Sequence, residues 1–211
     1  MKILSFDTSN NLASVSISLD AQIIAYESTK QDSQQAEQLF NLINESLKQA
    51  KISLNDIDLV SITNGPGSFT GVRIALAAAL GMELTLKAKF IAITNFQALA
   101  YYVREQSQTK KIATILDARR NQVYFQLFNS DLKEVSEPKL LDIENLLNYM
   151  PKNCIAIGDG IKFLPEFEEK FNFNVNAKIL VQASNFYFKN KLYHELEPLY
   201  IREPEVSMPK K

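Results

Sequence analysis

The chain of 211 residues is poor in the residue types that build metal, redox and covalent catalytic sites. It has one cysteine, one histidine and no tryptophan. A single cysteine excludes a disulfide within the chain, and the apolar strand pattern around Cys154 is typical of a buried thiol. A single histidine excludes a zinc site built on two histidines. His194 follows the last predicted helix and is a poor partner for a nucleophile, so we expect no catalytic residue and no metal site.

The charge balance and the lack of long apolar runs exclude further functions. The net charge is −1 and the pI is about 6.0, whereas a chain that gripped nucleic acid by itself would show a basic stripe. This balance gives no general attraction to nucleic acid. The longest apolar stretch is interrupted by Glu83 and Lys87, which leaves it too short to span a membrane. Because the N-terminus shows no signal-peptide core, we expect a cytoplasmic protein with no membrane partner.

The order of the apolar patterns predicts an α/β fold. Three antiparallel strands open the chain, with a hairpin at Asp20-Ala21, and the first helix is capped by Asp32 or Ser33. Helix, strand, helix, strand and helix then follow, which is the order of one lobe of the actin, hexokinase and Hsp70 superfamily. The predicted strands are 2–6, 13–19, 23–26, 57–62 and 90–93, and the predicted helices are 33–51, 69–87 and 96–104.

The second half repeats this opening in a degenerate form. Two strands, 112–117 and 123–128, flank a turn near Asp117 that echoes the turn near Asp7. We predict two actin-like (ASKHA, RNase H-like) lobes, each a mixed sheet with helices. The polar stretch before them places the boundary between an N-terminal lobe, 1–106, that carries the dimerisation helices, and a smaller C-terminal lobe, 107–211. Further elements are predicted at 143–149, 154–157 and 182–191, with a loop at 172–176.

A glycine-rich loop at 63–73, Thr-Asn-Gly-Pro-Gly-Ser-Phe-Thr-Gly-Val-Arg, joins a buried strand to a long helix. This layout can present free backbone N–H groups to an anion. The loop lacks the Gly-Lys-Ser/Thr ending of a Walker A motif, and Thr70 replaces the third glycine of a dinucleotide fingerprint. A tight turn with no ligand is therefore an equal alternative. In either case Ser68 or Thr70 can cap the helix.

The helix after this loop has almost no polar face. A helix that is apolar all round is buried on both sides, and in a chain this small one side is available to another protein. Arg73 in its first turn opposes the helix dipole, so we expect a phosphate or an acidic partner beside it rather than a solvated side chain. The predicted partner interface consists of Leu39, Ile43, Phe69, Arg73, Leu76, Ala78, Ala79 and Met82.

A nucleotide site is a second possibility raised by the residues. Its candidate phosphate-binding and nucleotide-binding residues are Asp7, Thr8, Gly65, Gly67, Ser68 and Asp117. The alternative is that Asp7 and Thr8 only form an Asx-type turn. The arginines after Asp117, Arg119 and Arg120, either meet a phosphate or carboxylate or are solvated on a hairpin turn.

As a whole string, residues 65–73 resemble the signature of the bacterial TsaB family, the partner protein in threonylcarbamoyladenosine modification of tRNA. The resemblance covers nearly the whole chain. Its further landmarks are the first strand and Asp-Thr turn at 3–9, Leu-Asp-Ala-Arg at 116–119 with Val-Tyr at 123–124, Gly-Asp-Gly at 158–160 and Glu-Pro-Leu-Tyr-Ile-Arg at 197–202. Gln35 stands where many family members carry a histidine, so any role of that histidine is not expected here.

The resemblance implies a non-catalytic scaffold subunit that dimerises with a TsaD-like paralogue and activates it. TsaD transfers a threonylcarbamoyl group from its adenylate to N6 of adenosine 37 in tRNAs that read A-starting codons. The family also implies a docking TsaE-like ATPase, a homodimer when the chain is alone, and no cofactor of its own, with ATP or ADP at the partner interface left open. Two alternatives remain: an actin-like small-molecule kinase or ATPase that acts alone, and a peptidase.

Overall fold

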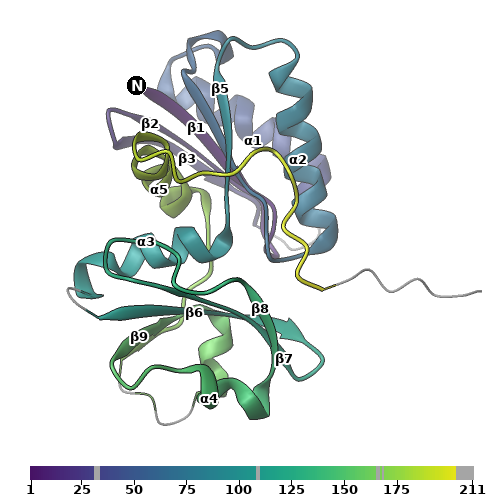
Figure 1. Ribbon diagram of the computed structural model, residues 1–211. Helices are drawn as coiled ribbons and strands as arrows, with labels where there is room; N and C mark the ends of the chain where they lie inside the picture. The colour runs from purple at the N-terminus through teal and green to yellow at the C-terminus, as the bar shows by residue number, and fades with distance from the viewer. Residues whose placement is uncertain (31–33, 108–109, 165–166, 168, 203–211) are drawn as a thin grey trace, which may run out of the picture.

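The computed structural model describes residues 1–211 except 31–33, 108–109, 165–166, 168 and 203–211, and shows two lobes, each built on a five-stranded sheet (Figure 1). Asp32 and Ser33, predicted as caps of the first helix, lie outside the described residues. That helix begins instead after Gln34, which makes no side-chain capping bond.

The first sheet has the order β3-β2-β1-β4-β5. Strands β1, β2 and β3 are antiparallel, whereas β4 and β5 run parallel to β1. The predicted hairpin is confirmed: Asp20 and Ala21 both have positive φ, 49° and 71°, which matches the right-handed twist of the flanking strands. The bounds are β1 Lys2–Asp7, β2 Ser14–Leu19, β3 Gln22–Ser28, β4 Leu59–Thr63 and β5 Lys89–Ile93.

The second sheet repeats the first in order and direction. Its order is β10-β9-β6-β7-β8, with β6, β7 and β8 antiparallel and with β9 and β10 parallel to β6. The predicted duplication of an actin-like lobe is therefore confirmed. The bounds are β6 Lys111–Arg119, β7 Gln122–Phe128, β8 Lys139–Asp142, β9 Cys154–Ile157 and β10 Lys170–Phe171.

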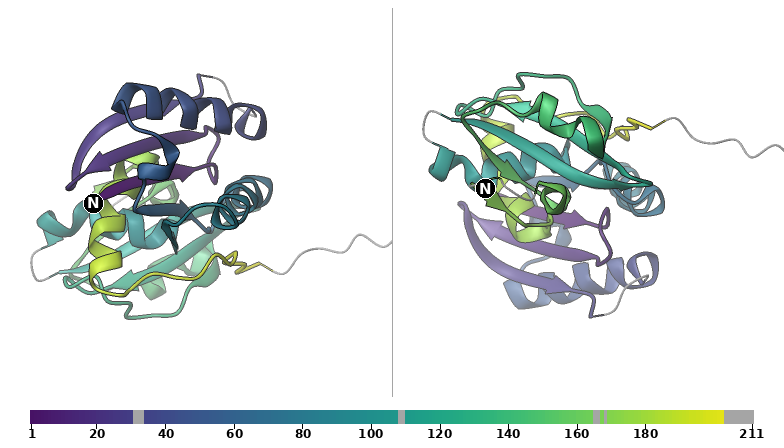
Figure 2. Two further views of the ribbon diagram at one scale, coloured as in Figure 1. Left: turned by 90° about the horizontal axis from the view of Figure 1, so that it is seen from above. Right: turned by 90° about the horizontal axis from the view of Figure 1, so that it is seen from below.

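The helices cover the sheets in an exchanged arrangement. Helices α1 (Gln35–Ala50) and α2 (Phe69–Glu83) cover one face of the first sheet, and α5 (Ala177–Lys189) covers the other (Figures 1 and 2). Helix α3 (Asn95–Ser107), although it precedes β6, packs on β6 and β9 of the second sheet. The strands of the first sheet all precede those of the second along the chain, but each lobe takes one helix from the other half of the chain.

Shorter helical pieces are found in both lobes. The helix predicted at 143–149 is a 3-10 turn, η2 (Ile143–Asn145), followed by a single turn, α4 (Leu146–Tyr149). Two more 3-10 turns are η1 (Leu54–Asp56) and η3 (Asp159–Phe163). Helix α5 begins earlier than predicted because the Asn176 side chain caps it, accepting hydrogen bonds from the N–H groups of Lys178 and Ile179.

Three apolar clusters hold the layers together. The central cluster lies between the two sheets and is filled by α3 and α5, with fully buried residues such as Phe96 and Tyr187. A second cluster packs the first sheet against α1 and α2, and a third fills the outer side of the second sheet. In the part of the chain that the structure describes, no helix has the length and apolar character needed to cross a bilayer.

Candidate functional site

The glycine-rich loop is bonded to the turn after β1. The Thr8 hydroxyl donates to the Gly71 carbonyl at 2.6 Å, and the Ser68 N–H donates to the Ser9 carbonyl at 2.8 Å. Asn95, at the start of α3, ties the two segments together: its Nδ2 donates to Ser9 Oγ at 2.8 Å and to the Pro66 carbonyl at 2.7 Å. The glycine-rich loop and the turn after β1 are thus fastened to each other.

The glycines of this loop permit that close approach. A Cβ on Gly71 would lie 1.8 Å from the Thr8 carbonyl oxygen, and a Cβ on Gly67 would lie 2.6 Å from the Ser9 carbonyl oxygen. The Gly71 N–H donates to Ser68 Oγ at 3.2 Å, which confirms Ser68 as the helix cap. Because the N–H groups of Ser68 and Gly71 bond within the chain, the arrangement fits the alternative of a ligand-free tight turn better than that of an anion cradle.

Asp7 is buried behind the turn. Its carboxylate accepts hydrogen bonds from the Ser9 N–H and hydroxyl, from Asn10 Nδ2 at 3.0 Å and from the Thr63 hydroxyl. Burial raises the pKa of Asp7 above its usual value, although these hydrogen bonds act in the opposite direction. The Asp7 carboxylate therefore forms the hydrogen bonds of an Asx-type turn with Ser9, whereas the Thr8 hydroxyl bonds to the glycine-rich loop.

Gln35, the first residue of α1, also fastens this turn. Its Nε2 donates to the carbonyl oxygens of Asn10 at 3.0 Å and Asn11 at 2.8 Å. Asn10 reaches across to the second half of the chain, where its Nδ2 donates to the Val175 carbonyl at 3.0 Å. The first turn therefore connects the start of α1 with the segment that leads into α5.

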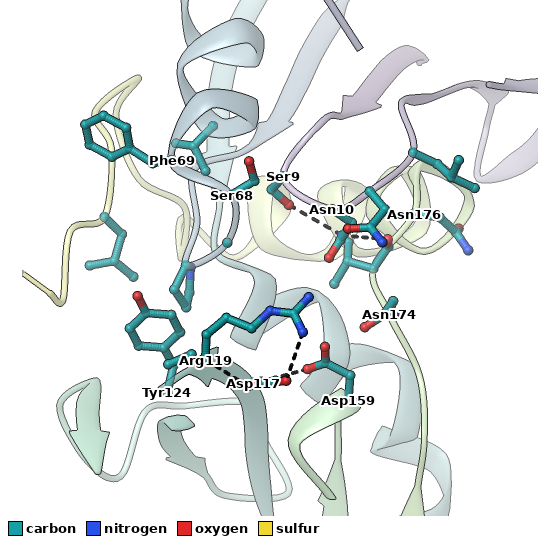
Figure 3. Close-up of a pocket in the computed structure, with 18 of the residues that line it drawn as sticks. Ser9, Asn10, Ser68, Phe69, Asp117, Arg119, Tyr124, Asp159, Asn174 and Asn176 are labelled. Carbon is teal, nitrogen blue, oxygen red and sulfur yellow. Dashed lines mark hydrogen bonds and ion pairs between the residues drawn. The ribbon is translucent and has the colours of Figure 1, made fainter. Parts of the chain in front are cut away.

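A cleft of about 960 Å³ lies between the two lobes (Figure 3). This volume lies within the range of small-molecule sites. Side chains from both lobes and from the loop before α5 point into it in the close-up. The lining residues that Figure 3 labels are Ser9, Asn10, Ser68, Phe69, Asp117, Arg119, Tyr124, Asp159, Asn174 and Asn176.

The second-lobe wall of the cleft carries a charged network. Asp117 accepts a hydrogen bond from Lys162 Nζ at 2.6 Å, and its other oxygen accepts one from the Arg119 N–H at 2.7 Å. Partial burial favours a raised pKa for Asp117, but the bonds from Lys162 and Arg119 outweigh it and lower that pKa. Asp159 accepts a hydrogen bond from the Asp117 N–H at 2.8 Å, and its pKa is raised by burial and by the nearby Asp117 charge.

The cleft brings together only part of the predicted nucleotide site. Gly67, Ser68 and Asp117 line it, whereas Asp7, Thr8 and Gly65 lie outside its lining. Sequence reasoning missed the polar lining residues that come from separate segments, and no periodic signal marks them: Asn10, Tyr124, Asn174, Asn176 and Arg202. Within the described ranges, no group of three or more His, Cys, Asp or Glu side chains is arranged to hold a metal ion.

The predicted partner interface needs a correction. Six of its residues are already packed inside this chain's own core: Leu39, Ile43, Leu76, Ala78, Ala79 and Met82. The exposed stripe of α2 is instead formed by Arg73, Ala77, Leu80, Gly81 and Leu84, spaced by three or four residues on one helix face. Leu80 is 45% and Leu84 87% exposed. The sequence could not assign the face, because the helix is apolar on both sides.

Arg73 at the start of this stripe meets aromatic rings. Its guanidinium lies 3.7 Å from the centroid of the Phe69 ring, and its Nε donates to the Tyr200 hydroxyl at 3.0 Å. The Phe69 and Tyr200 rings lie 5.4 Å apart. The expected phosphate or acidic partner is thus replaced, within this chain, by a cation–π stack with Phe69 and a hydrogen bond to Tyr200.

Comparison with known proteins supports one family. The family model described as TsaD, tRNA N6-adenosine threonylcarbamoyltransferase, matches residues 22–190. A tRNA threonylcarbamoyladenosine biosynthesis protein TsaB from Buchnera aphidicola subsp. Schizaphis graminum is 30% identical over 85% of this chain and 90% of its own length. The TsaB protein of Buchnera aphidicola subsp. Baizongia pistaciae is 28% identical over 95% of this chain and 98% of its own length.

Solved structures share the fold. A crystal structure from Pseudomonas aeruginosa, of a protein described as similar to the peptidase YEAZ, superposes with a TM-score of 0.81. The two sequences are 21% identical, and the match covers 95% of this chain and 99% of the other. At this identity the likeness shows the fold alone.

Proposed function

The chain belongs to the TsaB family of TsaD-related proteins, and from that premise we propose that it is a subunit for N6-threonylcarbamoyladenosine synthesis on tRNA. A role in this synthesis is supported by relatives of nearly equal length that carry this name. In our proposal the chain does no chemistry itself. It pairs with a TsaD-like transferase and activates it, and that transferase modifies adenosine 37 of tRNAs that read A-starting codons.

The observation that carries the proposal is the exposed apolar stripe on α2. Leu80 and Leu84 project from a helix whose opposite face is already buried on the first sheet. Ala77 and Gly81 lie beside them on the same exposed face, and small residues let a second helix approach closely. Phe40 on α1, 54% exposed, adds an aromatic side chain to this side of the lobe. An apolar surface of this kind suits a protein partner rather than tRNA.

The same surface offers a route to a homodimer when the partner is absent, since an isologous contact uses one patch on both copies. We propose that the TsaE-like ATPase docks on the assembled pair. We also propose that tRNA contacts this chain only through the complex, and that the chain holds no cofactor of its own, with ATP or ADP bound, if at all, at the partner interface.

An actin-like kinase or ATPase acting alone remains the second candidate, and the 960 Å³ cleft is the observation in its favour. The fastened loops count against it, because the hydroxyl of Thr8 and the N–H of Ser68 are engaged within the chain. Isothermal titration of the isolated chain with Mg-ATP separates the two. Micromolar binding would favour the kinase, and no measurable heat is the result expected for a scaffold subunit.

Pairing is tested with Leu80→Glu. Burying a leucine contributes about 1.5–3 kcal/mol, and a carboxylate forced into an apolar interface costs at least as much again. We therefore expect the TsaD-type partner to bind more than about a hundredfold more weakly, since 1.4 kcal/mol is a factor of ten. Light scattering after gel filtration, on the chain alone and mixed with the partner, gives the masses.

Leu147→Glu is the matched control. Leu147 lies on α4 in the other lobe and is 64% exposed, so the same change of charge and size is made far from the stripe. The control should pair as the parent chain does. If Leu80→Glu pairs normally, the α2 stripe is not the interface. If the parent chain itself does not bind the TsaD-type partner, the proposed function is refuted and the kinase becomes the leading candidate.

A further inference from the structure

Residues 192–202, which we call the C-terminal strap, leave α5 and run along the first lobe to the side of α2 (Figures 1 and 2). His194 pairs with Ala92 of β5 through two backbone hydrogen bonds of 2.9 Å. Further along, the Leu199 N–H donates to the Asn64 carbonyl at 2.8 Å, and Asn64 Nδ2 donates to the Glu197 carbonyl at 2.9 Å. The strap is thus bonded to β5 and to the start of the glycine-rich loop.

The end of the strap crosses to the second lobe. Arg202 donates to the side-chain oxygen of Gln122 on β7 at 2.6 Å, and Gln122 in turn donates to Asp142 on β8 at 3.0 Å. Residues 199–202 also line the cleft between the lobes. The strap therefore runs along the lining of the cleft from the first lobe to the second.

The lobes are joined differently on the other side of the cleft. There the buried residues of α3 and α5 pack together in the central cluster. On the strap side, Leu199 and Ile201 are only partly buried against the edge of this cluster, and Arg202 adds a hydrogen bond to the second sheet. Among the described residues, the α3–α5 side thus holds the more deeply buried apolar contact, and packed apolar area resists separation more strongly than a partly exposed contact.

The strap also touches the helix that carries the partner stripe. Tyr200 accepts the hydrogen bond from Arg73 and packs on Phe69. Arg73 is the first residue of the exposed stripe that continues through Ala77 to Leu84. A movement of the second lobe that displaces Arg202 would thus displace Tyr200, two residues earlier in the chain, and with it Arg73 at the start of the stripe.

We propose that the C-terminal strap is a latch that holds the cleft at its observed width and couples that width to partner binding on α2. Tyr200 anchors the latch to α2 and Arg202 anchors it to the second lobe. Opening the cleft breaks the Arg202 contact or displaces Tyr200. An ordered Phe69–Arg73–Tyr200 stack is therefore presented to the partner only when both contacts are made. The second half of this inference rests on the proposed function.

The test uses the double variant Tyr200→Phe/Arg202→Gln in the full chain. Phenylalanine keeps the ring that packs on Phe69 and removes the hydroxyl, and glutamine removes the guanidinium that reaches Gln122. Tyr193→Phe is the control, because it makes the same change on the strap at a side chain that stacks on Phe188 instead.

Cleft width is read from the distance between two nitroxide labels. Suitable positions are Asn44→Cys on α1 and Asn148→Cys on α4, both exposed and in opposite lobes. The native Cys154 can stay, because it is buried and its thiol pKa is raised to about 11. We expect a longer and broader distance distribution in the double variant and an unchanged one in Tyr193→Phe. An unchanged distribution in the double variant would refute the latch.

Partner binding is read separately, by titration of unlabelled chains with the TsaD-type partner. We expect the double variant to bind about tenfold more weakly, within the usual range of coupling between sites, and Tyr193→Phe to bind as the parent does. A wider cleft with unchanged affinity would refute the coupling and leave the proposed function intact. A parent chain that does not bind the partner would refute the proposed function and the coupling together, while the label distances still decide the latch.

Discussion

Replacing Gly71 by alanine tests whether the glycine-rich loop is fastened to the first turn. The new Cβ would lie 1.8 Å from the Thr8 carbonyl oxygen and 2.8 Å from its carbon, and both atoms belong to backbone, so helix or turn must move. Overpacking costs typically about 1–3 kcal/mol. The shift also breaks the Thr8–Gly71 and Ser68–Ser9 hydrogen bonds, at about 1 kcal/mol each. We expect a loss of about 3–5 kcal/mol.

Urea unfolding at 25 °C, followed by circular dichroism, measures this loss. Gly81→Ala is the matched control on the same helix, where an added Cβ meets no atom within 4 Å. Because alanine is the better helix former, that variant should gain about 0.5–1 kcal/mol. The measurement is made at a dilution where light scattering shows a monomer, since Gly81 lies on the proposed partner stripe.

A loss below about 1 kcal/mol for Gly71→Ala would refute the fastened loop. The rival reading, an anion cradle, predicts that Gly71→Ala changes nucleotide binding and leaves the free energy of unfolding almost unaltered. The size of the loss at Gly71 therefore separates close packing from ligand binding without any knowledge of the ligand.

Three further predictions concern titrating groups. Burial raises the pKa of Asp7 above its usual 3.8. Its contribution to stability is therefore fully present below pH 3.8 and is lost as the pH rises through the pKa of the folded state. In urea titrations, the stability of the parent relative to Asp7→Asn should fall over that pH range. The bonds to Lys162 and Arg119 lower the pKa of Asp117 despite its partial burial. Asp117→Asn should therefore lower the free energy of unfolding by about 1 kcal/mol at pH 7, a figure discounted for exposure. This loss should vanish as the pH falls below 3.8. Burial raises the pKa of Cys154 to about 11, so iodoacetamide at pH 7.5 should label it, by mass spectrometry, only after unfolding.

The strands could be predicted from the sequence because their local signals agree. Alternating or continuous apolar runs mark β2 and β9, and the four residues of β9, Cys154–Ile157, match the prediction. The repeated strand–turn–strand pattern around Asp7 and Asp117 predicted the duplication, although no residue-level repeat supports it. Patterns with a fixed period can be recognised in a single sequence.

The site could be predicted only in part, because its residues have no common period. The glycines at 67 and 71 were recognised, but a glycine needed for close packing and one needed for anion binding look the same in a sequence. The exposed face of α2 was misplaced since alanine and leucine occupy every side of it. The positions of Arg202 and Tyr200 in the cleft depend on the path of the strap. Contacts of α5 and β5, far from these two residues, set that path.

The exchange of helices between the lobes has a consequence for synthesis of the chain. The last strand of the first sheet ends at Ile93. Helix α5, which covers one face of that sheet, ends only at Lys189, roughly a hundred residues later. At about 5–20 residues per second, a nascent chain would leave this apolar face without its own helix for on the order of ten seconds. The N-terminal half released by a stop at the predicted boundary would keep that face bare, and so would be a substrate for chaperones rather than a small independent domain.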